Sequence, residues 1–278
     1  MKICFNQATT MKKSSLETDL ILCEKAGYDL IEIRLDKLRG YLRSHTVRDL
    51  ADFFQTSRLK PYAFNALEGI IFRDETGYRQ IKEDLKFLCE VGDQINCKKI
   101  VVVPSFDVGD YTKTEIKDES VRVLRDLGAF AEKYNAKLAY EFVGYPNCAV
   151  NTFGQAYEII AAVDRDNVGL VLDCFHFHAM GSRLQDLEAA DPDKIFIFHI
   201  DDAEDLPVGA LRDHNRLWPG EGAIDLDAIL STLRDIGCHG MASVELFRPE
   251  YWEWDIEQAI RVGKEKTEEV VRKYFPID

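Results

Sequence analysis

Short apolar runs recur along the chain, and each ends in polar residues. Between the runs, apolar residues return at the three- and four-residue spacing of a helix face, with charged residues at most other positions. Apolar runs that alternate with helices predict parallel strands buried on both faces, because strands of an antiparallel sheet would show polar alternation. The eight runs are Ile3–Asn6, Leu30–Arg34, Tyr62–Asn65, Ile100–Ser105, Leu138–Val143, Gly169–Asp173, Ile195–His199 and Ser243–Phe247.

Eight such units predict an α/β protein with a single (β/α)₈ barrel, the TIM barrel, spanning residues 1–278 as one domain. An open doubly wound sheet is the alternative, but no Gly-x-Gly-x-x-Gly turn follows the first strand. The longest irregular stretch runs from about Asp201 to Gly222. A long loop after a barrel strand commonly covers an active site.

Helix ends carry local signals. Ser14 followed by Glu17 predicts a capping box at the start of the first helix, and Gly27 stands where that helix should end. In the last predicted helix, Gly263 falls on the same face as the apolar residues between Ile256 and Tyr274. These signals fit helices that pack around a barrel.

Composition limits the partners. The net charge of −14, from 49 acidic and 35 basic residues, would repel a phosphate backbone, so we expect no nucleic acid. The seven cysteines show no Cys-x-x-Cys spacing, which favours reduced thiols over disulfides or a thiolate zinc site. No stretch approaches the roughly 18 consecutive apolar residues of a membrane span. We expect a cytoplasmic protein that does not enter a membrane.

The last four predicted strands end in residues that bind metals. Glu141, Asp173, His199 and Glu245 each follow apolar neighbours. A single carboxylate there is commonly an ion-pair partner, but four converging groups are tolerable only around a cation. The set predicts one divalent ion, and it fits Mn²⁺, Zn²⁺, Mg²⁺ or Co²⁺.

Two clusters lie beside this set. In the stretch from Asp173 to His178 a strand gives way to a helix, so His176 is expected to turn into the mouth of the barrel and His178 to point elsewhere. In the long loop, Arg216 and Trp218 precede a glycine turn and suit a hydroxylated ring. Trp218 as the packing anchor of a structural turn is an equal alternative.

The first three strands contribute further candidates for substrate binding. Asn6, Glu32, Arg34 and Asn65 lie at or near their strand ends and should face the same mouth. Glu32 and Arg34 could instead pair with each other. The sequence alone leaves both interpretations open.

At these residues the chain resembles the xylose-isomerase-like barrel superfamily of sugar isomerases, epimerases and endonuclease IV, whose signature is Glu, Asp, His and Glu on the last four strands. More closely, it resembles the inosose isomerases (2-keto-myo-inositol isomerases) of bacterial inositol catabolism. Residues 68–124 resemble that family least. The stretches that carry the closer resemblance are Cys4–Thr10, Val150–Phe153, Gly169–Asp173, Phe175–Gly181 and Val244–Tyr251.

This resemblance implies an isomerase that converts a cyclic keto-polyol, 2-keto-myo-inositol, to 1-keto-D-chiro-inositol. The metal would bind the ketone oxygen and a neighbouring hydroxyl, Glu141 and Glu245 would move the proton through an enediolate, and His176 would donate to the developing oxyanion. The expected partner is a small polyol or keto-polyol. A homo-oligomer is an open option.

Three other functions remain to be weighed. A ketose 3-epimerase or a sugar dehydratase would use the same ligands. An endonuclease IV-like repair enzyme needs three metals, but Asn65, Pro104 or Ser105, Arg216 and Trp218 stand where its extra ligands would be. A metal-stabilised binding protein would keep the ligands and need no base, so proton exchange separates it from an enzyme.

Overall fold

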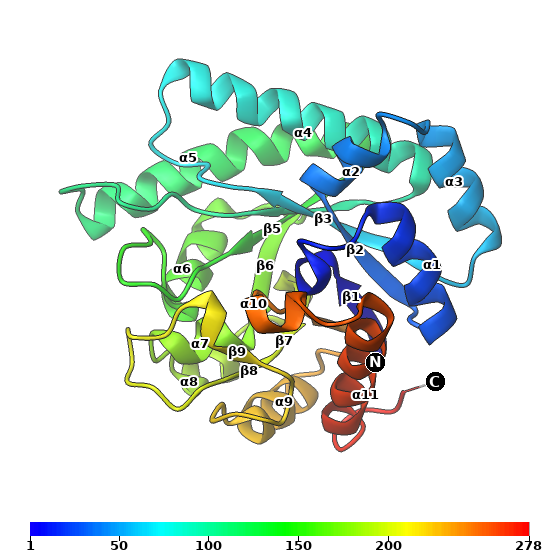
Figure 1. Ribbon diagram of the computed structural model, residues 1–278. Coiled ribbons are helices and arrows are strands. Elements are labelled where there is room, and N and C mark those ends of the chain that lie inside the picture. Colours follow the sequence, from blue (N-terminus) through cyan, green and yellow to red (C-terminus); the bar gives the residue numbers. More distant parts are fainter. Residues whose placement is uncertain (278) are drawn as a thin grey trace.

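The computed structural model describes residues 1–277 and shows eight parallel strands closed into a barrel (Figure 1). The strand order around the barrel is β1-β10-β7-β6-β5-β4-β3-β2. The predicted barrel is therefore confirmed. Its strands are β1 (Lys2–Asn6), β2 (Leu30–Arg34), β3 (Lys60–Leu67), β4 (Lys99–Val102), β5 (Lys137–Glu141), β6 (Val168–Asp173), β7 (Ile195–Ile200) and β10 (Met241–Val244).

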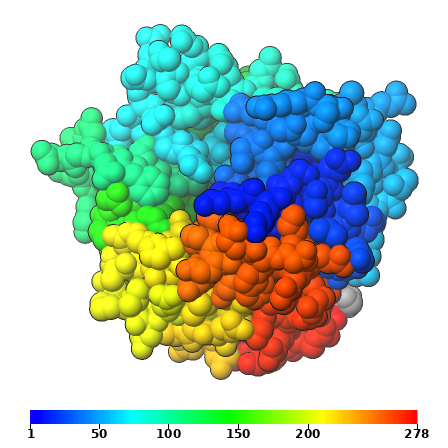
Figure 2. Space-filling view, in the orientation of Figure 1, coloured from blue at the N-terminus to red at the C-terminus, as the bar shows by residue number. Residues whose placement is uncertain are grey.

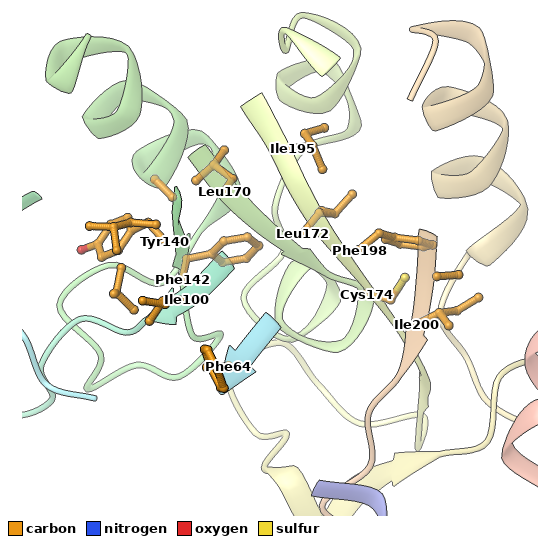
Figure 3. Packing of buried hydrophobic residues seen from close by; sticks show 14 of the residues in the cluster. Phe64, Ile100, Tyr140, Phe142, Leu170, Leu172, Cys174, Ile195, Phe198 and Ile200 are labelled. Carbon is orange, nitrogen blue, oxygen red and sulfur yellow. The ribbon is translucent and has the colours of Figure 1, made fainter. Parts of the chain in front are cut away.

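Helices surround the barrel on its outside (Figure 1). Strand residues that point outward, such as Phe64, Tyr140 and Phe198, pack against them in one large apolar cluster (Figure 3). The α-helices are α1 (Leu16–Ala26), α2 (Leu35–Tyr41), α3 (Val47–Thr56), α4 (Glu75–Ile95), α5 (Lys113–Ala131), α6 (Phe153–Val163), α7 (Cys174–Ala179), α8 (Leu184–Glu188), α9 (Leu226–Asp235), α10 (Pro249–Trp252) and α11 (Ile256–Val271).

The first helix begins one residue later than its sequence signal suggested. Ser15, not Ser14, caps α1, and its hydroxyl accepts a hydrogen bond from the Thr18 amide at 3.1 Å. A hydroxyl three residues before an amide is the usual N-cap geometry, and a serine pair leaves two registers open. Gly27 ends α1 with a positive φ of 80°, as predicted.

The barrel closes where the two ends of the chain meet. Strand β1 pairs with β10, and Figure 2 shows the dark-blue N-terminal segment pressed against the orange segment near residue 250. There the Trp252 indole donates to the Ala8 carbonyl at 2.9 Å, next to the 3₁₀ turn η1 (Gln7–Thr10). This contact covers the C-terminal end of β1.

The long loop after β7 is more ordered than its sequence suggested. It contains a two-stranded antiparallel sheet of β8 (Asp202–Ala203) and β9 (Arg216–Leu217), with the 3₁₀ turn η4 (Asp213–Asn215) between them. Asp202 fixes the glycine turn beyond, because its carboxylate accepts from the amides of Gly220 and Ile224 at 3.1 and 2.9 Å. Across residues 1–277, none of the helices has the length and apolar composition that crossing a bilayer requires.

Candidate metal centre and cavity

Four side chains meet at the C-terminal end of the barrel. Glu141 ends β5, Asp173 ends β6, His199 is the next-to-last residue of β7, and Glu245 follows β10 directly. One ligand atom from each lies within 4.8 Å of all the others, and all four residues are buried. The structure thus brings together the four residues that the strand ends predicted.

The group is electrostatically strained without a cation. His199 Nδ1 lies 3.1 Å from Glu141 Oε1 and 3.1 Å from Glu245 Oε2. Burial raises the pKa of Glu141 to about 8, although His199 partly offsets this. Burial alone would lower the pKa of His199, but the carboxylates of Glu245 and Glu32 raise it well above its usual value. Three carboxylates and one imidazole directed at one point are a donor set that fits a divalent ion.

Glu32 lies behind the histidine rather than in the mouth. Its Oε1 is 3.0 Å from His199 Nε2, and both side chains are fully buried. The alternative of a Glu32–Arg34 pair is wrong, since Arg34 pairs with Asp36 at 3.0 Å. A carboxylate that accepts from one ring nitrogen leaves the other, Nδ1, free to bind a metal, so Glu32 orients His199.

Asp173 is held by a buried arginine. Arg216 Nη1 donates to Asp173 Oδ2 at 2.8 Å and also pairs with Asp201, while Nε donates to Asp213 Oδ1 at 3.1 Å. Burial would raise the pKa of Asp173, but Arg216 holds it well below its usual value. Arg216 is fully buried and does not line the cavity, so it supports the ligands from outside the cavity.

His176 stands between the ligands and the cavity. Its amide donates to Asp173 Oδ1 at 2.6 Å, which caps α7. Its Nε2 lies 3.1 Å from Arg216 Nη2, and because a guanidinium only donates, this nitrogen accepts and the proton resides on Nδ1. Burial lowers the pKa of His176, which keeps the ring neutral. His178 is half-buried and does not line the cavity.

A cavity of about 150 Å³ opens above the ligands. Larger hollows of about 490 and 470 Å³ lie on the outside of the barrel and contain none of the ligands. We place the site at the smaller cavity, since barrel enzymes react at this face. It is lined by Arg34, Asn65, Ala66, Glu68, Val103, Phe106, Glu141, Val143, Tyr145, His176, Asp213, Glu245 and Phe247.

Two of the six predicted substrate contacts hold Glu245, and of the six only Arg34 and Asn65 line the cavity. Asn6 Nδ2 donates to Glu245 Oε1 at 2.7 Å, and Asn65 Nδ2 lies 3.4 Å from the same oxygen. Trp218 is packed away from the cavity, with its ring stacked on Tyr251 at 4.6 Å. Of the two interpretations of Trp218, the packing anchor of a structural turn agrees with this position, and contact with a substrate ring does not.

The sequence reading missed several cavity residues because they lie beyond the strand ends. Glu68, Phe106 and Tyr145 are in loops, Asp213 begins the 3₁₀ turn η4, and Phe247 is two residues past Glu245. No spacing rule marks such positions. For Glu68, Phe106 and Tyr145, the only available signal was their place within three residues of a predicted strand end.

Comparisons with known proteins agree with this geometry. A sequence model of the family described as xylose isomerase-like TIM barrel matches residues 20–266. The inosose isomerase of Halalkalibacterium halodurans is 54% identical over 279 residues, which cover 100% of this chain and 99% of that protein. The inosose isomerase of Bacillus subtilis is 55% identical over 276 residues, with 99% of each chain covered.

Solved structures are similar over nearly the whole chain, and one of them shares more than half of its sequence. It is that of the IOLI protein with a binding zinc atom, with a TM-score of 0.97, 55% identity and 99% of each chain covered. The zinc of that protein and the four converging side chains found here point to the same kind of centre.

Proposed function

The chain belongs to the xylose isomerase-like TIM barrel family, and from that premise we propose that it is an inosose isomerase, which moves the ketone of a cyclic keto-polyol to the neighbouring carbon. The observation that carries the proposal is a buried set of four metal-binding side chains beneath a cavity, in a chain 54–56% identical over its whole length to inosose isomerases. The proposed substrate is 2-keto-myo-inositol and the proposed product 1-keto-D-chiro-inositol.

Zinc is the metal we propose for Glu141, Asp173, His199 and Glu245. The support is the donor set itself, three carboxylates and an imidazole, together with the zinc of the similar crystal structure. A divalent ion in this position supplies Lewis acidity that makes the carbon beside a ketone easier to deprotonate. Glu32 and Arg216, which hold His199 and Asp173, would fix the geometry of the ligands.

The proton transfer is assigned to the two glutamates. A carboxylate of Glu141 or Glu245 takes the proton from the hydroxyl-bearing carbon beside the ketone, which gives an enediolate. The proton then returns to the former ketone carbon, and the hydroxyl proton of the neighbouring carbon passes to the oxygen of the former ketone, which becomes a hydroxyl as the carbonyl forms at the neighbouring carbon. Both glutamates line the cavity, and Asn6 and Asn65 orient Glu245.

His176 has a separate proposed role as a neutral hydrogen-bond donor. Its Nε2 already accepts from Arg216, and its Nδ1 has no partner among the described residues. A neutral imidazole that donates to the oxygen gaining charge stabilises an enediolate without releasing its own proton. Arg34 is the one Lys or Arg among the lining residues and is assigned to the substrate hydroxyls.

The test follows protons on the substrate ring. The zinc-loaded protein is incubated with 2-keto-myo-inositol in D₂O and followed by NMR. We expect deuterium to enter at the carbons that exchange the carbonyl, together with the signals of a second keto-inositol. Inversion at a carbon without movement of the ketone would indicate an epimerase, loss of water a dehydratase, and no change at all would refute enzymatic turnover of this substrate.

A matched pair of variants tests the base. Glu245→Gln should abolish exchange while the protein keeps part of its zinc, because an amide oxygen can still bind metal but takes no proton. Glu68→Gln changes another glutamate of the cavity lining that is not among the four ligands, and it should retain most of the exchange. Full exchange in Glu245→Gln would remove Glu245 as the base and leave Glu141.

A further inference from the structure

One side of the cavity is apolar, in contrast to the ligands beneath it. The end of β3 and the loops after β4 and β5 supply this side, which we call the apolar wall. Its inner part belongs to the apolar cluster inside the barrel, so it is continuous with the core. The apolar wall consists of Ala66, Val103, Phe106, Val143 and Tyr145.

Phe106 is the exposed member of this wall. The residue is 38% exposed, although its ring lies 6.3 Å from that of Tyr145. Five large hydrophobic residues of the described chain are exposed, and all but Ile21 lie on loops after β4 or β7, at the end of the barrel that holds the site. Of those five only Phe106 lines the cavity. An aromatic ring left open to a polar cavity calls for an apolar surface of a ligand to cover it.

The backbone holds Phe106 in place, so its position is not that of a loose loop. Phe106 forms a bridge with Cys148, and the amide of Asp107 donates to the Asn147 carbonyl at 2.9 Å. On the other side, the Ala149 amide donates to the Ser105 carbonyl at 3.1 Å. The ring is therefore presented by a fixed turn, which favours recognition of one shape.

A six-membered polyol ring has a surface that fits this wall. In a chair with all hydroxyls equatorial, the polar groups form a rim and each face carries only C–H bonds, whereas an axial hydroxyl interrupts one face. We propose that Phe106 is a specificity-determining residue that packs against an uninterrupted C–H face of the substrate. This inference rests on the proposed function, because it takes the ligand to be a cyclic keto-polyol.

The stereochemistry of the proposed reaction agrees with such a wall. 2-Keto-myo-inositol has only equatorial hydroxyls, and 1-keto-D-chiro-inositol has one axial hydroxyl. Each therefore keeps at least one uninterrupted C–H face, and the same wall can hold substrate and product. A ring with axial hydroxyls on both faces has no such face and should be rejected.

Two unreactive cyclitols test this without turnover. scyllo-Inositol has only equatorial hydroxyls, and D-chiro-inositol has one axial hydroxyl on each face. The dissociation constants of both are measured by calorimetry on the zinc-loaded wild type, on Phe106→Ala and on Tyr111→Ala. Tyr111 is the matched control, since it is an exposed aromatic residue of the same loop that stacks on Phe72 and does not line the cavity.

We expect the wild type to bind scyllo-inositol with a dissociation constant about tenfold lower than that of D-chiro-inositol, because scyllo-inositol can cover part of the aromatic ring with apolar surface. The preference should fall to about twofold in Phe106→Ala, through weaker binding of scyllo-inositol, and persist in Tyr111→Ala. Phe106→Leu, which keeps the volume without a flat ring, should give an intermediate preference. An unchanged preference in Phe106→Ala, or equal losses for both cyclitols, would overturn the inference.

The proposed function and this inference fail in different ways. Turnover of 2-keto-myo-inositol by the wild type, combined with an unchanged preference in Phe106→Ala, overturns the role of Phe106 alone. A wild type that neither turns over the keto-polyol nor binds either cyclitol overturns both.

Discussion

The contact between Glu32 and His199 leads to a quantitative prediction about metal affinity. Glu32→Gln keeps an oxygen that can accept from His199 Nε2 but removes the buried negative charge 3.0 Å from it. A hydrogen bond to a charged group contributes about 1.5–3 kcal/mol, against about 0.5–1.5 kcal/mol for a neutral one. The difference of about 1–1.5 kcal/mol corresponds to roughly tenfold weaker zinc binding.

A second variant extends the series. Glu32→Ala leaves the Nε2 proton without an acceptor in a fully buried position, and we expect zinc affinity to fall by about a hundredfold, the upper end of what loss of such a partner costs. Asp36→Asn is the control, because Asp36 is a nearby carboxylate whose side chain is 61% exposed and does not contact the ligands.

Zinc affinity is measured by competition with a chromogenic chelator at one fixed pH near neutrality, with thermal unfolding of each metal-free variant as a check of the fold. The expected order is wild type and Asp36→Asn, then Glu32→Gln, then Glu32→Ala. Equal affinities for wild type and both Glu32 variants would refute the view that this carboxylate orients His199.

Three further predictions concern charge and packing. In the metal-free protein the pKa of Glu141, about 8, lies above its unfolded value of about 4.3, and the pKa of His199 is also raised. The stability that both groups contribute is therefore present at low pH and lost as pH rises. Zinc affinity should rise with pH, because binding releases protons that calorimetry in buffers of different ionisation enthalpy detects. Arg216→Met should lower the free energy of unfolding by about 3–5 kcal/mol in urea titrations, because it leaves buried carboxylates unpaired; a loss below 1 kcal/mol would contradict that. Gly92→Ala should cost at least about 2 kcal/mol by the same assay, since its methyl group would clash with a backbone carbonyl, whereas Gly40→Ala, with open space around it, should be neutral or stabilising.

Much of the fold and the ligand set could be predicted because both depend on local patterns. Apolar runs gave the strands, and barrel topology places every strand end at one face, so Glu141, Asp173 and His199 had to meet. The partners of these ligands could not be predicted in the same way. Glu32 and His199 are 167 residues apart in the sequence. That Glu32 contacts His199 and does not pair with Arg34 depends on how side chains pack inside the closed barrel.

The same limit explains why the roles of two residues in the long loop could not be predicted from the sequence. Arg216 and Trp218 are two residues apart in a short strand and its continuation, and both are large groups near a predicted site. Their neighbours decide their roles: Arg216 turns toward three aspartates, and Trp218 toward Tyr251. A spacing rule cannot distinguish these environments, because they are made by distant parts of the chain.

The pairing of β1 with β10 has a consequence for the order in which the protein is made. Glu245, the last of the four ligands to be synthesised, is held by Asn6, which is synthesised before all four. A nascent chain that lacks β10 therefore carries three of the ligands and a first strand that can pair with β2 but not with β10, and it has no complete site for a metal. Metal capture should come only after barrel closure, so the bound ion reports a finished fold and cannot serve as the nucleus on which the chain folds.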